Sequence, residues 1–183
     1  MVQNAADFSL RPLTLDDAPR IAELIGDWEV VRWLSGPPHP YAVADAAEFL
    51  ATMPDQARSG GRHSAIVIEG QFAGMVGIDF RRQEPNAGLW NLGYWLGRPY
   101  WGRGIMTRAA GRLTQDFFAK SSETELKSGY FSGNEASWAI QKRLGFEMLG
   151  EGLLFNRPQG KRLPHIETVL TRERFEVKNR SAI

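Results

Sequence analysis

The stretch Arg98-Pro99-Tyr100-Trp101-Gly102-Arg103-Gly104-Ile105-Met106-Thr107 carries the strongest signal in the chain. It joins a predicted strand, residues 89–96, to a predicted helix, residues 105–119. Glycines let a backbone approach a ligand closely, and the first turn of a helix offers unpaired N–H groups at the positive end of the helix dipole. Between Glu84 and Asp116 the chain has four arginines and no acidic residue. This combination is typical of a phosphate-binding loop.

Two common phosphate loops do not fit these residues. Gly97 and Gly102 have the first spacing of a nucleoside-triphosphate loop, but Arg103 and Gly104 replace its lysine and hydroxyl residue. The dinucleotide fingerprint matches only at its first two glycines, because Thr107 stands where the third is needed. The residues that would bind these ligands are therefore missing.

Composition narrows the class of protein further. The chain has 183 residues, of which 43% are apolar and 23% charged, as in an ordinary globular protein. Strand and helix patterns alternate without a linker, so we expect one mixed α and β domain spanning residues 1–183. The formal net charge of +1 gives no reason to expect a nucleic acid or a membrane as partner.

Several kinds of site are excluded or disfavoured by residue type. The absence of cysteine excludes disulfides, thiolate zinc sites and a cysteine nucleophile. His39, His63 and His165 lack the spacing of metal ligands, so we expect no metal. We find neither an apolar run of the roughly 20 residues needed to span a bilayer nor a signal-peptide pattern. We therefore expect a cytoplasmic protein.

Hydrophobic periodicity predicts the remaining elements. We expect a short strand over residues 8–14 and helices from Asp16, around residues 28–34 and over residues 43–58. Strands follow over residues 64–68, 72–80, 89–96 and 125–131, and a helix over residues 134–144 ends at Gly145. Two closing strands start at Phe146, and the tail from Arg174 is predicted to be loosely held.

Several ordered motifs carry a family resemblance. Leu92-Gly93-Tyr94-Trp95-Leu96 precedes Trp101-Gly102-Arg103-Gly104, and Asn134, Ser137 and Gly145-Phe146 follow. Upstream, Pro38-His39-Pro40-Tyr41 stands ahead of Asp45-Ala46 and Phe49. In this order the set resembles the GCN5-related N-acetyltransferases (GNAT family), and most closely their RimJ/RimL-like branch of ribosomal-protein N-terminal acetyltransferases. The resemblance covers most of the chain.

The resemblance implies a fold and a reaction. The fold is α/β (α+β): a central, mostly antiparallel, twisted sheet with helices on both faces and a V-shaped split, with Gly93 as the candidate bulge at the split. The reaction is direct transfer of the acetyl group of acetyl-CoA to a primary amine, either a protein N-terminus or a small amine or amino-acid derivative. Family analogy suggests a homodimer. The alternatives are a non-catalytic module that binds or senses acyl-CoA and an enzyme for a bulkier acyl group.

The resemblance also implies site residues. Ser137 would lie near the leaving sulfur, and Asn134 would bind the pantetheine region and cap its helix. The acceptor pocket is predicted to include Trp33, Tyr41, Trp90 and Asn91, although aromatic residues are more often part of a core. The predicted cofactor-binding set is Tyr94, Trp95, Leu96, Trp101, Gly102, Arg103, Gly104, Ile105, Met106, Thr107, Asn134 and Ser137.

Two positions depart from the family pattern. Gln141 stands where many members have a tyrosine general acid, and Asn91 where many have a glutamate base. Asp79 or Glu84 could replace the base through water, and His165 is placed to approach the cleft or to be an ordinary half-buried strand residue. Because an α-amine with a pKa of about 8 is partly neutral at pH 7, the missing base favours an α-amine or another amine of low pKa as acceptor.

Overall fold

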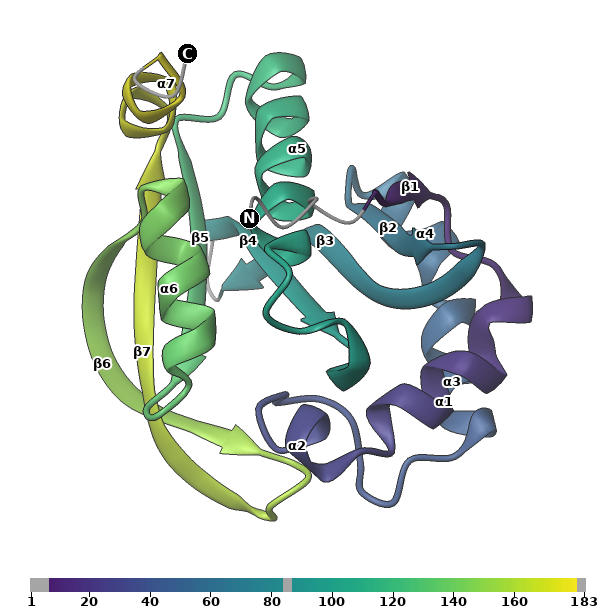
Figure 1. Ribbon diagram of the computed structural model, residues 1–183. Helices are drawn as coiled ribbons and strands as arrows, with labels where there is room; N and C mark the ends of the chain where they lie inside the picture. The colour runs from purple at the N-terminus through teal and green to yellow at the C-terminus, as the bar shows by residue number, and fades with distance from the viewer. Residues whose placement is uncertain (1–6, 84–86, 181–183) are drawn as a thin grey trace, which may run out of the picture.

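The computed structural model describes residues 7–83 and 87–180 (Figure 1). Its strands are β1 (Ser9–Arg11), β2 (Arg62–Ile68), β3 (Gln71–Gln83), β4 (Ala87–Leu96), β5 (Glu125–Phe131), β6 (Glu147–Asn156) and β7 (Lys161–Thr171). Its α-helices are α1 (Ala18–Ile25), α2 (Trp28–Val31), α3 (Val43–Ala51), α4 (Met53–Arg58), α5 (Ile105–Lys120), α6 (Glu135–Leu144) and α7 (Arg172–Arg180). Short 3-10 turns, η1 (Leu15–Asp17) and η2 (Arg98–Tyr100), precede α1 and α5.

The strands form one mixed sheet in the order β1-β2-β3-β4-β5-β7-β6. All neighbouring strands are antiparallel except β4 and β5, which are parallel. The predicted central, mostly antiparallel sheet is confirmed. In the described chain, the pairing of β4 with β5 is limited to Asn91 and Lys127, and Figure 1 shows the β5, β6 and β7 group diverging from β4. This divergence is the expected V-shaped split.

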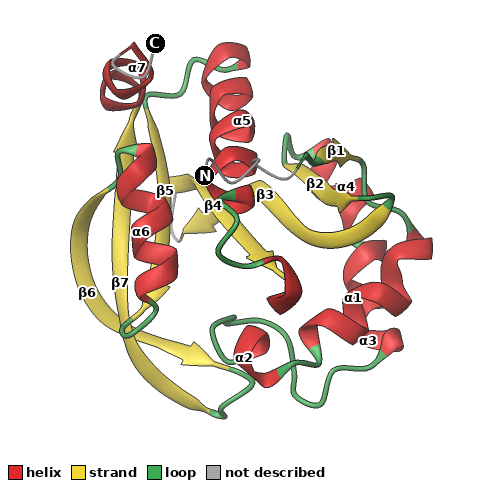
Figure 2. Ribbon diagram, in the orientation of Figure 1, coloured by secondary structure: helices red, strands yellow, loops and turns green. Residues whose placement is uncertain are grey.

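Helices cover both faces of the sheet (Figure 2). Each face has its own apolar core. Consecutive strand side chains point to opposite faces. On β2, Ala65 therefore packs in the core of α1, α2 and α3, and Ile66 in the core beneath α5. The same alternation on β4 places Trp95 in the first core and Leu92 in the second. This alternation fixes which β4 side chains point to each face of the sheet at the split.

The apex of the split is closed by a side chain. Ser128 of β5 is buried, and its hydroxyl donates to the carbonyl oxygen of Leu92 at 2.9 Å. A Cβ added at Gly93 would meet no atom within 4 Å, so this glycine borders open space. The predicted bulge at Gly93 is not found against β3, because Gly93 pairs with Gly77 in an unshifted register. The split opens on the β5 side instead.

Two predicted elements differ from the structure. The helix expected over residues 43–58 is two helices, because Pro54 in the first turn of α4 cannot donate a backbone hydrogen bond to a preceding helical turn. The tail from Arg174 is not loosely held as far as Arg180, and residues 181–183 lie outside the described residues. It belongs to α7, whose Phe175 is buried against Phe118 of α5, with ring centroids 5.7 Å apart.

Candidate active site

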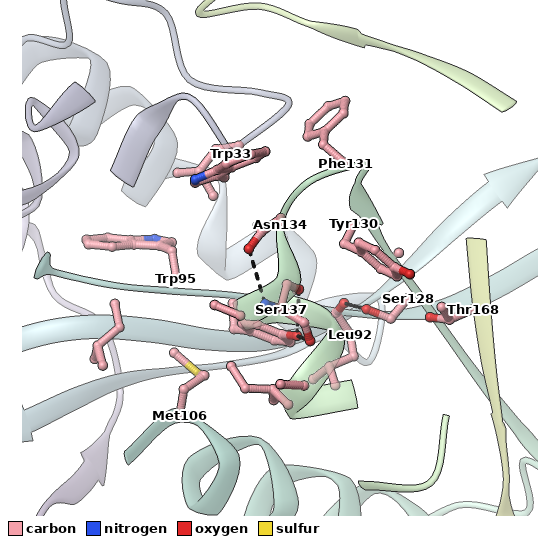
Figure 3. Close-up of a pocket in the computed structure, with 18 of the residues that line it drawn as sticks. Trp33, Leu92, Trp95, Met106, Ser128, Tyr130, Phe131, Asn134, Ser137 and Thr168 are labelled. Carbon is pink, nitrogen blue, oxygen red and sulfur yellow. Dashed lines mark hydrogen bonds between the residues drawn. The ribbon is translucent and has the colours of Figure 1, made fainter. Parts of the chain in front are cut away.

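A cleft of about 900 Å³ opens at the split between β4 and β5. Its walls come from both sides of the split and from the first turns of α5 and α6. It collects all of the predicted cofactor-binding residues: Tyr94, Trp95, Leu96, Trp101, Gly102, Arg103, Gly104, Ile105, Met106, Thr107, Asn134 and Ser137. Motifs up to 43 residues apart in the sequence therefore meet in one cavity, as Figure 3 shows for several of them.

The loop after β4 is shaped by two left-handed glycines. Gly102 has φ +73° and Gly104 has φ +65°, and a Cβ added to either would meet no atom within 4 Å. Glycine is needed here for backbone conformation rather than for lack of space. Gly104 is the N-cap of α5 and has no side chain to cap the helix, so the first amides of α5 remain available to a ligand. Trp101 fixes the loop to β4 by donating from Nε1 to the carbonyl of Leu96 at 2.6 Å.

The charge around this loop is more local than the arginine count suggests. Of the four arginines between Glu84 and Asp116, only Arg103 lines the cleft. Arg98 lies 3.8 Å from Asp27, and the guanidinium groups of Arg108 and Arg112 lie over the ring of Phe8. Three further cations line the cleft: Arg81 of β3, Lys127 of β5 and Arg143 of α6. Sequence reasoning missed Arg143, which lies outside the loop motif and is brought in by the docking of α6 beside the split.

The start of α6 holds the two residues predicted to act near the thioester. Asn134 is the N-cap of α6, and its Oδ1 accepts from the backbone N–H of Ser137 at 3.1 Å (Figure 3). The predicted capping role of Asn134 is thereby confirmed. The Ser137 hydroxyl oxygen lies 2.9 Å from the phenol of Tyr94 on β4, across the split. Tyr94 from one wall and Ser137 from the other therefore meet at the base of the cleft.

Gln141 lies beneath Ser137, fully buried, in a hydrogen-bonded network. Its Nε2 donates to the carbonyl of Gly129 at 3.2 Å and to the hydroxyls of Ser128 and Ser137, each at 3.3 Å. Its Oε1 accepts from the hydroxyl of Thr168 at 2.7 Å. Because the Gly129 carbonyl can only accept, the atom of the Gln141 amide that faces it must be the nitrogen. The same nitrogen faces the Ser137 hydroxyl, which must therefore accept from it.

This polarity determines what Ser137 can donate. Its Oγ accepts from Gln141, and Tyr94 has one phenolic proton in reach of both the Oγ and the backbone oxygen of Ser137. When Tyr94 donates to the Oγ, the proton of Ser137 is left to point into the cleft. Burial raises the pKa of Tyr94, and its hydrogen bonds to Ser137 and Gln141 only partly oppose this, so the phenol stays protonated at neutral pH.

The four predicted acceptor residues separate into two pairs. Trp33 and Asn91 line the cleft, and the Trp33 ring lies 3.6 Å from the position of a Cβ on Gly133, across the split. Tyr41 and Trp90 do not line it. Tyr41 packs against the core of α1 and α3, where burial, with a smaller contribution from Asp45, raises its pKa to about 12.

Strand alternation explains the position of Trp90. It neighbours Asn91 in sequence and therefore points to the opposite face. There its ring lies between those of Phe80 and Phe117, with centroids 5.2 and 5.5 Å away. The placement of Tyr41 and Trp90 in the acceptor pocket is thus corrected: both are packing residues.

Two residues are sequence candidates for a base in place of the glutamate that Asn91 replaces, and a third is a candidate to approach the cleft. Asp79 lies directly across from Asn91 in the β3–β4 ladder, but its carboxylate is 2.5 Å from His63 Nε2. Glu84 lies outside the described residues. His165, by contrast, lines the cleft from β7.

The architecture and the cleft together define the class. A mixed sheet that parts beside a glycine loop and the N-terminus of a helix is the arrangement of acyl-CoA N-acyltransferases. The family model described as "Acetyltransferase (GNAT) domain" matches residues 7–147, and the chain belongs to this family. It is a GNAT N-acetyltransferase, as the motifs indicated.

Relatives agree with this assignment. The uncharacterized N-acetyltransferase p20 of Bacillus licheniformis is 28% identical over 156 residues, covering 84% of this chain and 85% of that protein. RimJ of Mycobacterium smegmatis, solved in complex with CoA-disulfide, has a TM-score of 0.80 at 20% identity, covering 97% of this chain and 90% of that one. The ribosomal-protein-S5-alanine acetyltransferase of Vibrio fischeri has a TM-score of 0.76 at 21% identity, covering 92% and 94%. These two structures show the shared fold.

Residues 7–83 and 87–180 contain neither a candidate membrane-spanning helix nor a candidate metal-binding cluster. No helix in this part of the chain is both long and apolar enough to cross a membrane. Within the same residues, no group of three or more histidine or acidic side chains is arranged to hold a metal ion. The expectation that no metal takes part stays a prediction.

Proposed function

We propose that this enzyme transfers the acetyl group of acetyl-CoA directly to the α-amine of a protein N-terminus. The observation that carries the proposal is the cleft itself, where the open edge of β4, the glycine loop and Ser137 border one cavity. In RimJ of Mycobacterium smegmatis the same fold holds CoA-disulfide. The ribosomal-protein-S5-alanine acetyltransferase supplies a precedent for a protein acceptor.

The residues of the cleft fit a pyrophosphate and an extended amide chain. Backbone amides from Gly102 to Thr107 would bind the pyrophosphate at the positive end of α5, with Arg103 and Arg143 nearby. Beyond Asn91, β4 is paired with β3 on one side only. Its free edge around Trp95 and Leu96 would accept hydrogen bonds from, and donate them to, the amides of the pantetheine arm.

Transfer then needs one bond to form and one to break. The neutral amine attacks the thioester carbon, and the carbon–sulfur bond breaks with its electron pair leaving on sulfur. Gln141 donates to the Ser137 hydroxyl oxygen, and when Tyr94 donates to it as well, Ser137 would donate its hydroxyl hydrogen toward that sulfur. A positioned donor of this kind stabilises charge that develops in the transition state.

Two features favour a polypeptide α-amine as acceptor. Leu149 and Leu153 of β6 line the cleft and are 55% and 62% exposed, so its mouth on this side is open and apolar. At pH 7 roughly one α-amine in ten is neutral, against roughly one lysine in 2,500, which lowers the demand for a strong base. Asn91 in place of the usual glutamate is consistent with such an acceptor.

The test begins with calorimetric titration of acetyl-CoA into the purified protein. Thiol release is then measured with three acceptors: a lysine-free peptide with a free N-terminus, the same peptide with a blocked N-terminus and one internal lysine, and a small primary amine. We expect binding, and release with the first peptide only. Binding without release from any acceptor would favour the non-catalytic acyl-CoA module, and release with the small amine alone would overturn the protein acceptor.

A further inference from the structure

A histidine lies at the split on the opposite face of the sheet from Tyr94. His165 of β7 is paired with Phe131 of β5 and Gly152 of β6, and lines the cleft. Directly paired strand residues share a face. The Phe131 and His165 rings accordingly meet edge to face, with centroids 5.4 Å apart.

The other face of β5 belongs to α6. Ser128 is hydrogen-bonded by Gln141, and the Tyr130 ring stacks on Trp138 of α6 at 5.5 Å. Ser137 therefore approaches the split from the α6 side, whereas His165 approaches it from the opposite side. An acceptor amine and a departing thiolate also need separate approaches to the thioester, so this arrangement places one polar group on each.

Gly129 brings the imidazole close to the apex of the split. A Cβ added to Gly129 would lie 2.4 Å from His165 Cε1 and 2.8 Å from Nε2, so the ring occupies the space of a side chain at residue 129. Gly129 follows Lys127, the β5 partner of Asn91, by two residues. At about 3.3 Å per residue the imidazole lies over β5 roughly 7 Å from the last β4–β5 pair.

The electrostatic surroundings keep this imidazole in its basic form. The charged groups around it are Glu167 on β7, Lys127 on β5 and Arg81 on β3. Lys127 is paired with Glu125 at 2.9 Å, and Arg81 Nε lies 3.8 Å from Asp79. Burial lowers the pKa of His165, Glu167 opposes that effect and Arg81 adds to it, so the ring is neutral at pH 7.

From this placement we propose that His165 is the general base of the reaction, receiving a proton from the acceptor's ammonium group directly or through one water molecule. The inference rests on the proposed transfer to an α-amine. One proton passes from nitrogen to the imidazole before attack. The second leaves the nitrogen as the tetrahedral adduct collapses and ends on the CoA thiolate, which yields amide, thiol and one imidazolium that returns its proton to solvent.

The test compares kcat/KM for the peptide acceptor between about pH 5.5 and about pH 9.5 in the wild type, His165→Gln and His39→Gln. His39 is a suitable control because it is an exposed histidine outside the cleft lining, with its ring tilted against that of Trp28. We expect His165→Gln to lose about 10²-fold at pH 6.5, the usual size of a general-base contribution. The loss should shrink below about tenfold near pH 9, where the α-amine is already neutral.

Two further readouts separate a base from a packing residue. Acetyl-CoA affinity should change less than about twofold in His165→Gln, and added imidazole should restore activity to His165→Ala but not to Ser137→Ala. A loss that is equal at every pH, or no imidazole rescue, would overturn the assignment. If the wild type transfers no acetyl group, the proposed function fails as well; if it does and His165→Gln keeps its full rate at pH 6.5, only this inference fails.

Discussion

Replacing Gln141 by leucine tests whether the buried network supports the apex of the split. Leucine is close to glutamine in size but cannot form hydrogen bonds. The Thr168 hydroxyl then loses its acceptor and the Gly129 carbonyl loses a donor. Ser128 keeps its bond to Leu92, so it is not left unsatisfied. One buried group, the Thr168 hydroxyl, and one partly buried group, the Gly129 carbonyl, are thus left without these partners.

The size of the effect follows from that count. An orphaned buried group costs about 1–3 kcal/mol. Because Thr168 is fully buried and Gly129 only partly, we expect about 3 kcal/mol in Gln141→Leu. In a chain of this length about 1 kcal/mol shifts Tm by about 2–4 °C. The expected fall in Tm is therefore about 6–12 °C, measured by thermal and urea unfolding.

A double-mutant cycle with Thr168→Val makes the reasoning refutable. Thr168→Val alone leaves Gln141 Oε1 without its donor, whereas the double variant removes both partners of that bond. We expect the double variant to be no less stable than Gln141→Leu, which corresponds to a coupling of about 1–2 kcal/mol. If Gln141→Leu is within about 1 kcal/mol of the wild type, or if the two losses simply add, the network does not hold the apex.

Three other predictions concern the loop, the hydroxyl and acid stability. Gly104→Val forces a β-branched residue to φ +65° and should weaken acetyl-CoA binding at least about tenfold in calorimetry, whereas Gly70→Val carries a similar left-handed strain in the β2–β3 turn and should not change that affinity. Ser137→Ala should lower kcat about 10–10²-fold while acetyl-CoA affinity stays within about threefold; an unchanged kcat would remove the hydroxyl from the reaction. Burial raises the pKa of Asp17, but hydrogen bonds from Arg11 and a backbone amide outweigh it and leave the pKa below 3.8. Its stabilising effect is therefore present above about pH 4 and lost as pH falls through the lowered value, so unfolding curves of the wild type and Asp17→Asn should converge there.

The fold could be predicted from sequence because the motifs are local and ordered. The loop at residues 98–107, the capping pair Asn134 and Ser137, and the end of α6 at Gly145 each depend on residues a few positions apart. The pattern of a strand followed by a helix is also local. The structure confirmed these elements with boundaries shifted by a few residues.

The parts that failed depend on distant partners. The tail from Arg174 is polar, and α7 is anchored by distant partners: the Phe118 ring against Phe175, and backbone carbonyls at the end of α6 that accept from Arg174 and Lys178. Trp90 is aromatic like a pocket residue, but its face is set by the register of β4 with β3. The network of Gln141 joins residues from β4, β5, α6 and β7, and one sequence cannot show that these strands and this helix converge.

The split also changes how the sheet meets its surroundings. A seven-stranded sheet ordinarily has two free edges, but one that parts in the middle has four, two on β1 and β6 and two along the interior of the wedge. Unpaired strand edges invite pairing with other chains and so promote aggregation. Here the interior edges of β4 and β5 line the cleft instead of forming an outer edge of the sheet. An extended cofactor arm that enters the cleft would therefore pair with a strand edge in the middle of the sheet.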